Sequence, residues 1–476
     1  MNKECKAHPL MLFFYLKPLL FLLILPVSRK ITEYFTGGSP KKGFRLEILI
    51  LASTLLLSAA RYSAFRIIYN QSFIIIKSGA IFKGCAKIPV SSLSSLQTEQ
   101  SFIDALFGAV TCKINTEAGV RGKADFRFKL NITSSRELTK LLFGGSVLSV
   151  KRFSPLKAAV MAAVTSSAIT GAVVGVPILN RAGKLLSVAV SQKLLERIQS
   201  LSNSPNTFAP PIVNTISLIF LAFYGFSFFY LFLRYLNFRL VLHRDEIEVC
   251  SGFFVRKKCY FKKSAVTAVK IEQAPLMRLF KRYSVGADIG GFGEAKHKNQ
   301  IILPAGRATE LKSVLKTCFP FIAAGGKSIR VKRSRLLRNR FLFLPSVYLL
   351  CMIIGSAVLA RKFKDFTHFI FFSCLTALFL IFCYSFVCLY EYRHSAVCFG
   401  KIVHARSIKG FRAFSLYIPQ KNLGEIKITR FGMDFPLKTC RVRLTVCSEQ
   451  AESIRIKHLD YKTVMAQIKK DFLSDE

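Results

Sequence analysis

The chain has 476 residues, of which 51% are hydrophobic, and it carries a formal net charge of +44 at pH 7. Apolar and basic residues must therefore be separated along the chain, which is typical of membrane spans joined by basic loops and domains. The 13 cysteines include no Cys-x-x-Cys pair, which argues against a zinc site and a disulfide framework.

Residues 1–68 predict two transmembrane helices. The first apolar run, 10–27, follows two lysines as in a signal peptide, but no small-residue cleavage site comes after it. We therefore expect a retained span. The second run, 46–68, carries Arg61 and Arg66 in its last turns, where arginine can reach the membrane surface.

Residues 69–148 predict a small β-domain. Short apolar runs separated by Gly and Ser turns indicate five strands between 73 and 130. A short helix over 102–107 and an amphipathic helix over 136–143 complete a mostly antiparallel domain that is capped by its last helix.

Residues 149–236 predict two more spans, 155–179 and 212–233. The first carries two glycines four residues apart, which either suit close helix packing in lipid or are simply tolerated there. Between the spans, residues 181–202 have one broad apolar face opposite basic residues. This pattern indicates either a helix lying along the bilayer surface or a helix packed on another segment.

Residues 237–325 repeat the first β-domain. Five matched pairs are each 173 residues apart: Gly79 with Gly252, Glu99 with Glu272, Gln100 with Gln273, Leu106 with Leu279 and Phe107 with Phe280. A constant offset over almost thirty residues indicates that one folding unit occurs at least twice.

Residues 326–390 predict the last two spans, 341–359 and 366–390, after a basic tract. Residues 391–476 predict a third, divergent β-domain, in which Gly400 is taken to occupy the place of Gly252. The Glu-Gln pair has no counterpart there.

The predicted fold is therefore six transmembrane helices in three pairs, each pair followed by a β-domain with a C-terminal helix. Even numbers of spans place the N-terminus and all three domains on one side of the membrane. The distribution of Lys and Arg near the span ends favours the cytosolic side, and free cysteines on predicted strands fit a reducing compartment.

Several short segments resemble the bacterial membrane proteins with pleckstrin-homology-like domains, the YdbS/YdbT-like family. They are His8-Pro9-Leu10, Phe223-Tyr224-Gly225-Phe226, Gly252, Glu272-Gln273 with Leu276 and Leu279, and Cys318-Phe319-Pro320. The resemblance implies a pleckstrin-homology-like β-sandwich or barrel, a multi-pass protein of the bacterial cell membrane, and no established ligand or activity. A smaller membrane protein of the same family is a candidate partner.

The sequence holds no pattern of a catalytic or metal site. Residues 324–328 end like a phosphate-binding loop, but Phe321 stands where that loop needs glycine. The histidines lack metal-binding spacing, and no nucleophile motif occurs. We therefore expect no enzymatic activity, no metal and no cofactor.

One predicted hairpin carries the candidate site for anionic lipid. Its basic residues are Arg256, Lys257, Lys258, Lys262 and Lys263. They lie near the turn where, as the resemblance implies, a pleckstrin-homology fold receives acidic head groups, and a membrane surface attracts each such cation by about 1 kcal/mol. The alternative is that they only determine topology. Nucleic acid is not expected, because aromatic residues are not interleaved in the basic runs.

The predicted function is a non-enzymatic integral membrane protein whose cytosolic domains bind anionic lipid or a protein partner. The alternative is an export or immunity component for an amphiphilic compound such as an antimicrobial peptide, with the six spans forming the route.

Overall fold

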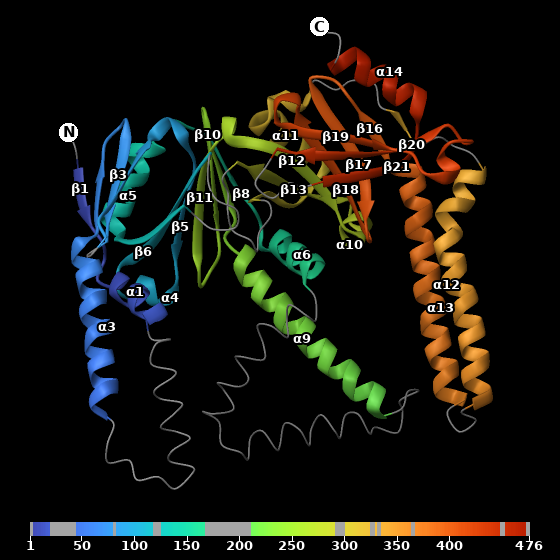
Figure 1. Ribbon diagram of the computed structural model, residues 1–476, viewed down its shortest axis with the longest axis horizontal. Helices are drawn as coiled ribbons and strands as arrows, with labels where there is room; N and C mark the ends of the chain where they lie inside the picture. Colours follow the sequence, from blue (N-terminus) through green and yellow to red (C-terminus); the bar gives the residue numbers. More distant parts are fainter. Residues whose placement is uncertain are drawn as a thin grey trace. The chain divides into compact units, whose positions relative to one another are not determined.

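The computed structural model describes residues 3–19, 44–79, 82–117, 125–166, 211–290, 300–323, 329–330, 335–362, 367–447 and 453–472 (Figure 1). The chain forms two compact units. The first unit is Met1–Ala265 with Gly290–Lys296, and the second unit is Val266–Ile289 with His297–Glu476.

The described strands follow one plan three times along the chain, with seven strands and a closing helix in each repeat. Repeat 1 contains β1 (Lys3–Lys6), β2 (Arg66–Tyr69), β3 (Phe73–Ser78), β4 (Gly84–Pro89), β5 (Leu93–Gln100), β6 (Ala109–Thr116), β7 (Phe126–Asn131) and α5 (Ile132–Leu142). Its first four strands form an antiparallel sheet in the order β1-β2-β3-β4.

Repeat 2 contains β8 (Val147–Arg152), β9 (Arg239–His243), β10 (Glu246–Ser251), β11 (Arg256–Lys262), β12 (Val266–Gln273), β13 (Arg282–Ile289), β14 (Gln300–Arg307) and α11 (Ala308–Cys318). Repeat 3 contains β15 (Ile329–Arg330), β16 (Ala396–Cys398), β17 (Ile402–Lys409), β18 (Arg412–Pro419), β19 (Leu423–Thr429), β20 (Thr439–Val446), β21 (Ser453–Asp460) and α14 (Tyr461–Phe472). A short helical turn follows the fifth strand of each repeat: α4 (Phe102–Leu106), α10 (Pro275–Leu279) and the 3-10 turn η8 (Gly432–Asp434).

Successive repeats are joined edge to edge into continuous sheets. In the first unit, β5 of repeat 1 pairs antiparallel with β11 of repeat 2, which produces the seven-stranded sheet β7-β6-β5-β11-β10-β9-β8. In the second unit, β12 of repeat 2 pairs with β18 of repeat 3, which produces the sheet β14-β13-β12-β18-β17-β16-β15. We call these pairings the first junction and the second junction.

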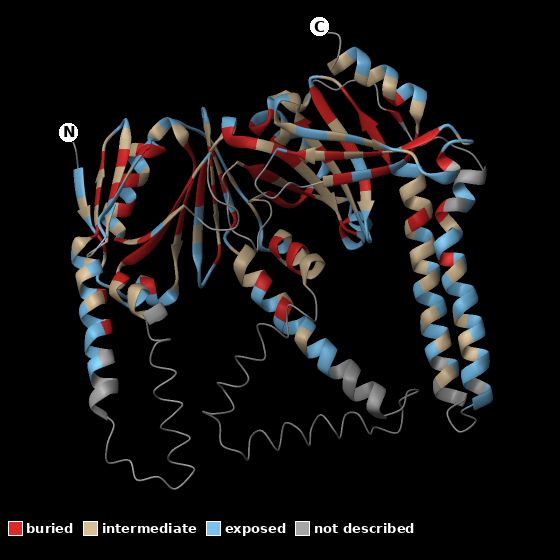
Figure 2. Ribbon diagram, in the orientation of Figure 1, coloured by how far each residue is buried: buried red, intermediate tan, exposed pale blue. Residues whose placement is uncertain are grey.

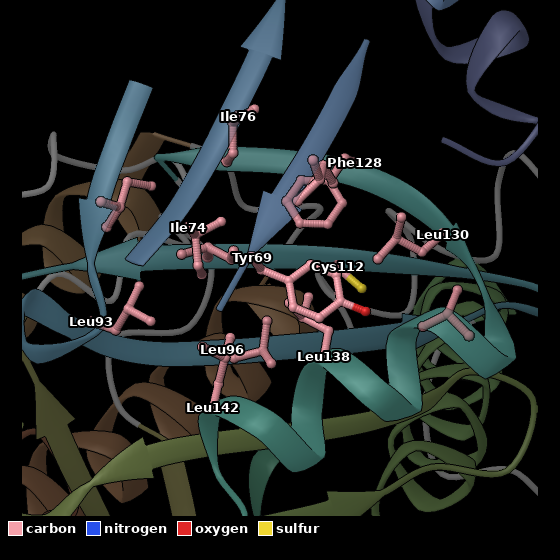
Figure 3. Close-up of a cluster of buried hydrophobic side chains, with 14 of the residues drawn as sticks. Tyr69, Ile74, Ile76, Leu93, Leu96, Cys112, Phe128, Leu130, Leu138 and Leu142 are labelled. Carbon is pink, nitrogen blue, oxygen red and sulfur yellow. The ribbon is translucent and has the colours of Figure 1, made fainter. Parts of the chain in front are cut away.

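The core of repeat 1 lies between its two sheets. Along β2 and β3 every second side chain is buried, as expected for strands with one face on a core. Figure 3 shows Tyr69 and Ile74 from these strands near Leu96 of β5 and Leu138 of α5. In repeat 3, a second cluster joins residues of β16 to β18, β20, β21 and α14.

The predicted order of helices and strands is wrong. In every repeat the helices lie between the first and the second strand: β1 precedes α1 (Met11–Leu19) and α3 (Phe44–Ala64), yet it pairs with β2, which follows them. The same holds for α6 (Pro155–Thr165) and α9 (Pro211–Tyr235) between β8 and β9, and for α12 (Arg335–Lys362) and α13 (Thr367–His394) between β15 and β16. The helices are thus inserted into each β-domain.

The prediction of six transmembrane helices is also wrong. Among the described residues, two segments are long and apolar enough to cross a membrane, Phe341–Leu359 in α12 and Ser373–His394 in α13. Figure 2 shows that the described residues of these two helices are mostly exposed or intermediate, with few buried. In α3 the uncharged stretch between Glu47 and Arg61 has 13 residues, fewer than the about 20 that a span needs.

The other predicted spans are shorter or fall partly outside the description. Helix α6 has 11 residues, and the apolar segment 219–235 is part of the longer helix α9. Residues 20–27, 167–179 and the interfacial helix predicted over 181–202 lie outside the described residues.

Candidate functional site

Glycine is required at the hairpin that carries the predicted basic residues. Gly252 follows β10 with φ of +102°, and a Cβ there would lie 2.0 Å from the carbonyl oxygen of Val255. Gly79 has the same role in repeat 1, with φ of +96° and a Cβ position 1.9 Å from the carbonyl oxygen of Phe82. Both constraints exclude any side chain. In repeat 3 the corresponding hairpin, between β17 and β18, contains Gly410 rather than the predicted Gly400.

Three of the five predicted basic residues bind within the first unit. Lys257 forms an ion pair with Glu99 across the first junction. Lys262 Nζ donates to two carbonyl oxygens of the turn Val90–Ser92, at 2.7 and 2.9 Å. Lys263 Nζ donates to two carbonyl oxygens at the end of β9, at 3.0 and 2.6 Å. These three lysines therefore hold β11 to its surroundings.

The remaining two, Arg256 and Lys258, line a cavity of about 680 Å³ between α5 and the paired strands β5 and β11. Two further cations, Arg136 and Lys140, reach the same cavity from α5, where residues four apart share one helix face. Within the described part of the chain, none of these four side chains makes an ion pair. We call this site the cationic cavity, and its volume lies in the usual range for ligand pockets.

The wall opposite α5 is polar and partly buried. His243 Nδ1 lies 2.7 Å from the carbonyl oxygen of Gly145, which can only accept, so Nδ1 carries a proton. The other ring nitrogen, Nε2, is buried, has no hydrogen-bond partner within the described residues, and lies 3.8 Å from Glu248 Oε2. Glu248 Oε1 accepts hydrogen bonds from the Tyr260 hydroxyl at 3.0 Å and the Cys250 thiol at 3.1 Å.

These two donors to Glu248 stay neutral. Burial, and then the adjacent Glu248 carboxylate, raise the pKa of the Cys250 thiol to about 12. The same two causes raise the pKa of the Tyr260 hydroxyl. Four cations therefore face one carboxylate in the cationic cavity, and the excess charge favours an anionic ligand.

Glu99 lies at the first junction, on β5. Its carboxylate is bound by Lys257 of repeat 2 and by Lys113, whose Nζ lies 3.0 Å from Oε2. Burial by itself would raise the pKa of Glu99, but the two ammonium groups outweigh it and hold the pKa below its ordinary value. This glutamate therefore stabilises the junction as an ion.

The repeated glutamine has one structural task in both copies. Gln100 Nε2 donates to the carbonyl oxygen of Ala109 at 3.3 Å, and Gln273 Nε2 donates to that of Arg282 at 3.2 Å. Each bond ties the end of the fifth strand to the start of the sixth. The matching glutamate differs, because Glu272 pairs with Lys270 on its own strand at 2.9 Å.

Exposed apolar side chains gather at the end of the first junction. A second cavity of about 610 Å³ is lined by Phe13 and Phe14 of α1, Ile103 of α4, Phe107 directly after α4, and Val255 of the hairpin. All five are exposed. These side chains form an exposed apolar surface at the end of the first junction.

The structure thus separates the predicted site residues. It brings Arg256 and Lys258 together with residues that sequence reasoning missed, namely Arg136, Lys140 and the His243–Glu248 pair. The two basic residues four apart on the closing helix were a signal in the sequence. His243 and Glu248 carried no such signal, because only the sheet places them beside α5.

The bacterial PH domain family matches the chain over residues 18–144 and 186–317, which together make up more than half of it. Comparisons with curated proteins and with solved structures found no match. The two matched segments cover most of repeats 1 and 2, so the predicted pleckstrin-homology-like domains and their repetition are confirmed. This chain therefore belongs to the bacterial PH domain family.

Proposed function

We propose that the protein is a membrane-attached, non-enzymatic binding module whose cationic cavity takes a phosphate-bearing anionic head group of a lipid. The observation that carries the proposal is the set of four cations around one cavity, none of which forms an ion pair with a described residue, and the buried Nε2 of His243 in its wall. Phosphate oxygens accept charge-assisted hydrogen bonds from Arg and Lys, which are about twice as strong as neutral ones.

A lipid is favoured over a soluble phosphate because of the membrane helices. The apolar segments of α12 and α13 have 19 and 22 residues, long enough to cross the hydrocarbon core as a helical hairpin. The basic tract 327–340, which precedes the apolar segment of α12, supports a cytosolic location of the β-domains. The specific resemblance to YdbS/YdbT-like membrane proteins is part of this proposal.

The cytosolic location of the β-domains has a direct test. Cys447, at the end of β20, is exposed, so a membrane-impermeant thiol reagent should label it only after cells are broken. Labelling of Cys447 in intact cells would refute the cytosolic location.

The cavity itself is tested with the full-length protein in neutral detergent. The probes are a short-chain phosphatidylglycerol, the matching phosphatidylcholine and inorganic phosphate. We expect phosphatidylglycerol to bind and the double variant Arg136→Gln/Lys258→Gln to weaken that binding at least tenfold, because two charge-assisted contacts are lost.

The matched control is Lys77→Gln/Arg244→Gln, which removes the same charge from two exposed residues of the first unit that do not line the cavity. Equal weakening by the control would show that general charge, not the cavity, attracts the lipid. If inorganic phosphate binds and phosphatidylglycerol does not, the proposal of a lipid ligand is refuted. The export alternative depended on six spanning helices, which the structure does not support.

A further inference from the structure

The two junctions inside the chain have the same register. At the first junction Gln100 lies opposite Arg256, and Glu99 lies opposite Lys257. At the second junction, Gln273 lies opposite Ala413 and Glu272 lies opposite Phe414. In both cases the last residues of a repeat's fifth strand pair with the start of the next repeat's fourth strand.

One strand of each type remains at the edge of its sheet. Among the described strands, β4 is the fourth strand of repeat 1 and ends the sheet β1-β2-β3-β4, while β19 is the fifth strand of repeat 3 and ends the sheet β19-β20-β21. The fifth strands are equivalent in detail, because β5, β12 and β19 each follow a 3-10 turn and each carry a bulge near their first residue.

Pairing at a junction completes the core of the earlier repeat. Leu96 of β5 and Val269 of β12 are fully buried, opposite Tyr260 and Tyr417 of the following repeat. Their equivalent in β19 is Ile426, which is only partly buried and packs at the margin of the repeat 3 core. The edge of repeat 3 thus lacks the cover that the other two repeats receive.

We propose that β19 of one copy of the protein pairs antiparallel with β4 of a second copy, in the register of the two internal junctions. This register places Lys87 opposite Ile426, Cys85 opposite Ile428 and Ile88 opposite Glu425. The aliphatic part of Lys87 then covers Ile426 on the same face of the sheet.

The residues of β4 are compatible with this pairing. Proline is often found on strands that must stay unpaired. Pro89 occupies the same place as Pro419, the last residue of β18, and β18 nevertheless pairs with β12 over residues 413–417 at the second junction. Lys83 and Arg430 meet at the end of the pairing. The guanidinium of Arg430 is turned away, stacked over Phe435 and Tyr461 of its own repeat at 4.5 Å from each ring.

The association is head to tail. The two edges differ, so each copy presents one acceptor and one donor strand, and addition does not close after two copies unless the geometry forms a ring. The product is therefore a chain or ring of copies in which sheets continue from one protein to the next.

The native Cys85 provides a test in the full-length protein. It is free and exposed, and the variant Ile428→Cys places a second thiol directly opposite, where the Cβ atoms of an antiparallel pair are about 5 Å apart. Mild oxidation or a short thiol cross-linker should then produce dimers and higher multimers. The matched control is Thr429→Cys, whose side chain points to the other face of the sheet.

We expect the multimers of Ile428→Cys to disappear in the Cys85→Ser/Ile428→Cys variant and to be at least tenfold weaker with Thr429→Cys. Three results would overturn the proposal: no product that depends on Cys85, a cross-link within a single chain, or dimers of Ile428→Cys that persist without Cys85. Dimers of Ile428→Cys that persist without Cys85 would indicate that β19 pairs with β19 of a second copy. The absence of any product that depends on Cys85 would indicate that a different protein pairs with these edges.

Discussion

Replacing Glu99 by glutamine should open the first junction. The side chain of Glu99 is 16% exposed and that of Lys113 only 7%, so the substitution removes a carboxylate charge from beside a buried ammonium. Breaking a buried pair in this way costs about 3–5 kcal/mol. Lys257 is one third exposed and adds at most about 1 kcal/mol, while the amide oxygen of glutamine still accepts one hydrogen bond. We therefore expect a loss of about 3 kcal/mol.

The buried thiol of Cys259 reports this opening, because it lies on β11 opposite Gln97. If a thiol reagent labels Cys259 only when the junction is open, a loss of 3 kcal/mol in Glu99→Gln corresponds to labelling about 100-fold faster than in the wild type. The control is Glu272→Gln at the second junction, where the glutamate is more exposed and pairs along its own strand. It should leave the labelling of Cys259 unchanged. A rate for Glu99→Gln within threefold of the wild type would refute the reasoning.

The same glutamate sets an acid limit. Since its folded-state pKa is lower than the ordinary value of 4.5, its stabilisation is complete above that value and is lost as the pH falls through the folded-state pKa. Thermal unfolding followed by circular dichroism should therefore show a stability loss below about pH 4.5 that Glu99→Gln does not share.

Three further predictions concern single positions. Gly252→Ala should destabilise the protein by about 2–3 kcal/mol in denaturant unfolding, since the new Cβ meets a backbone oxygen at 2.0 Å. The control Gly410→Ala should cost only about 1 kcal/mol in the same measurement, because Gly410 has a φ of +60° and open space around it. Burial, together with a neighbouring arginine, lowers the pKa of His404 from 6.5 to about 4. Folding stability should therefore decrease by up to about 3 kcal/mol as the pH falls from 6.5 to 4, because the unfolded chain binds the proton more readily. Thermal melts of His404→Phe should lack this decrease, and a variant with the same pH profile as the wild type would contradict the prediction. Asp104→Asn should cost about 3 kcal/mol because it leaves Lys129 without its buried partner, and the double variant Asp104→Met/Lys129→Met should recover most of this loss; equal melting temperatures of the two variants would contradict the assignment.

Local chemistry was readable from the sequence wherever it acts over a few residues. The hairpin glycines Gly79 and Gly252 repeat because a positive φ and a nearby carbonyl oxygen admit only glycine. The Glu-Gln pairs mark the end of the fifth strand in two repeats, and the apolar runs after residue 340 form the long helices α12 and α13. Periodicity also indicated strands such as β6 within a residue or two of their observed ends.

Only the tertiary structure decided how these elements combine. Alternation of apolar residues specifies which face of a strand is buried, but it says nothing about which strand lies along its edge, since backbone hydrogen bonds are the same for every sequence. The pairing of β1 with β2 across the inserted helices, and of β5 with β11 more than 150 residues away, therefore had no local signal. The cationic cavity depends on that second pairing, because it brings Lys258 and Arg256 beneath Arg136 and Lys140.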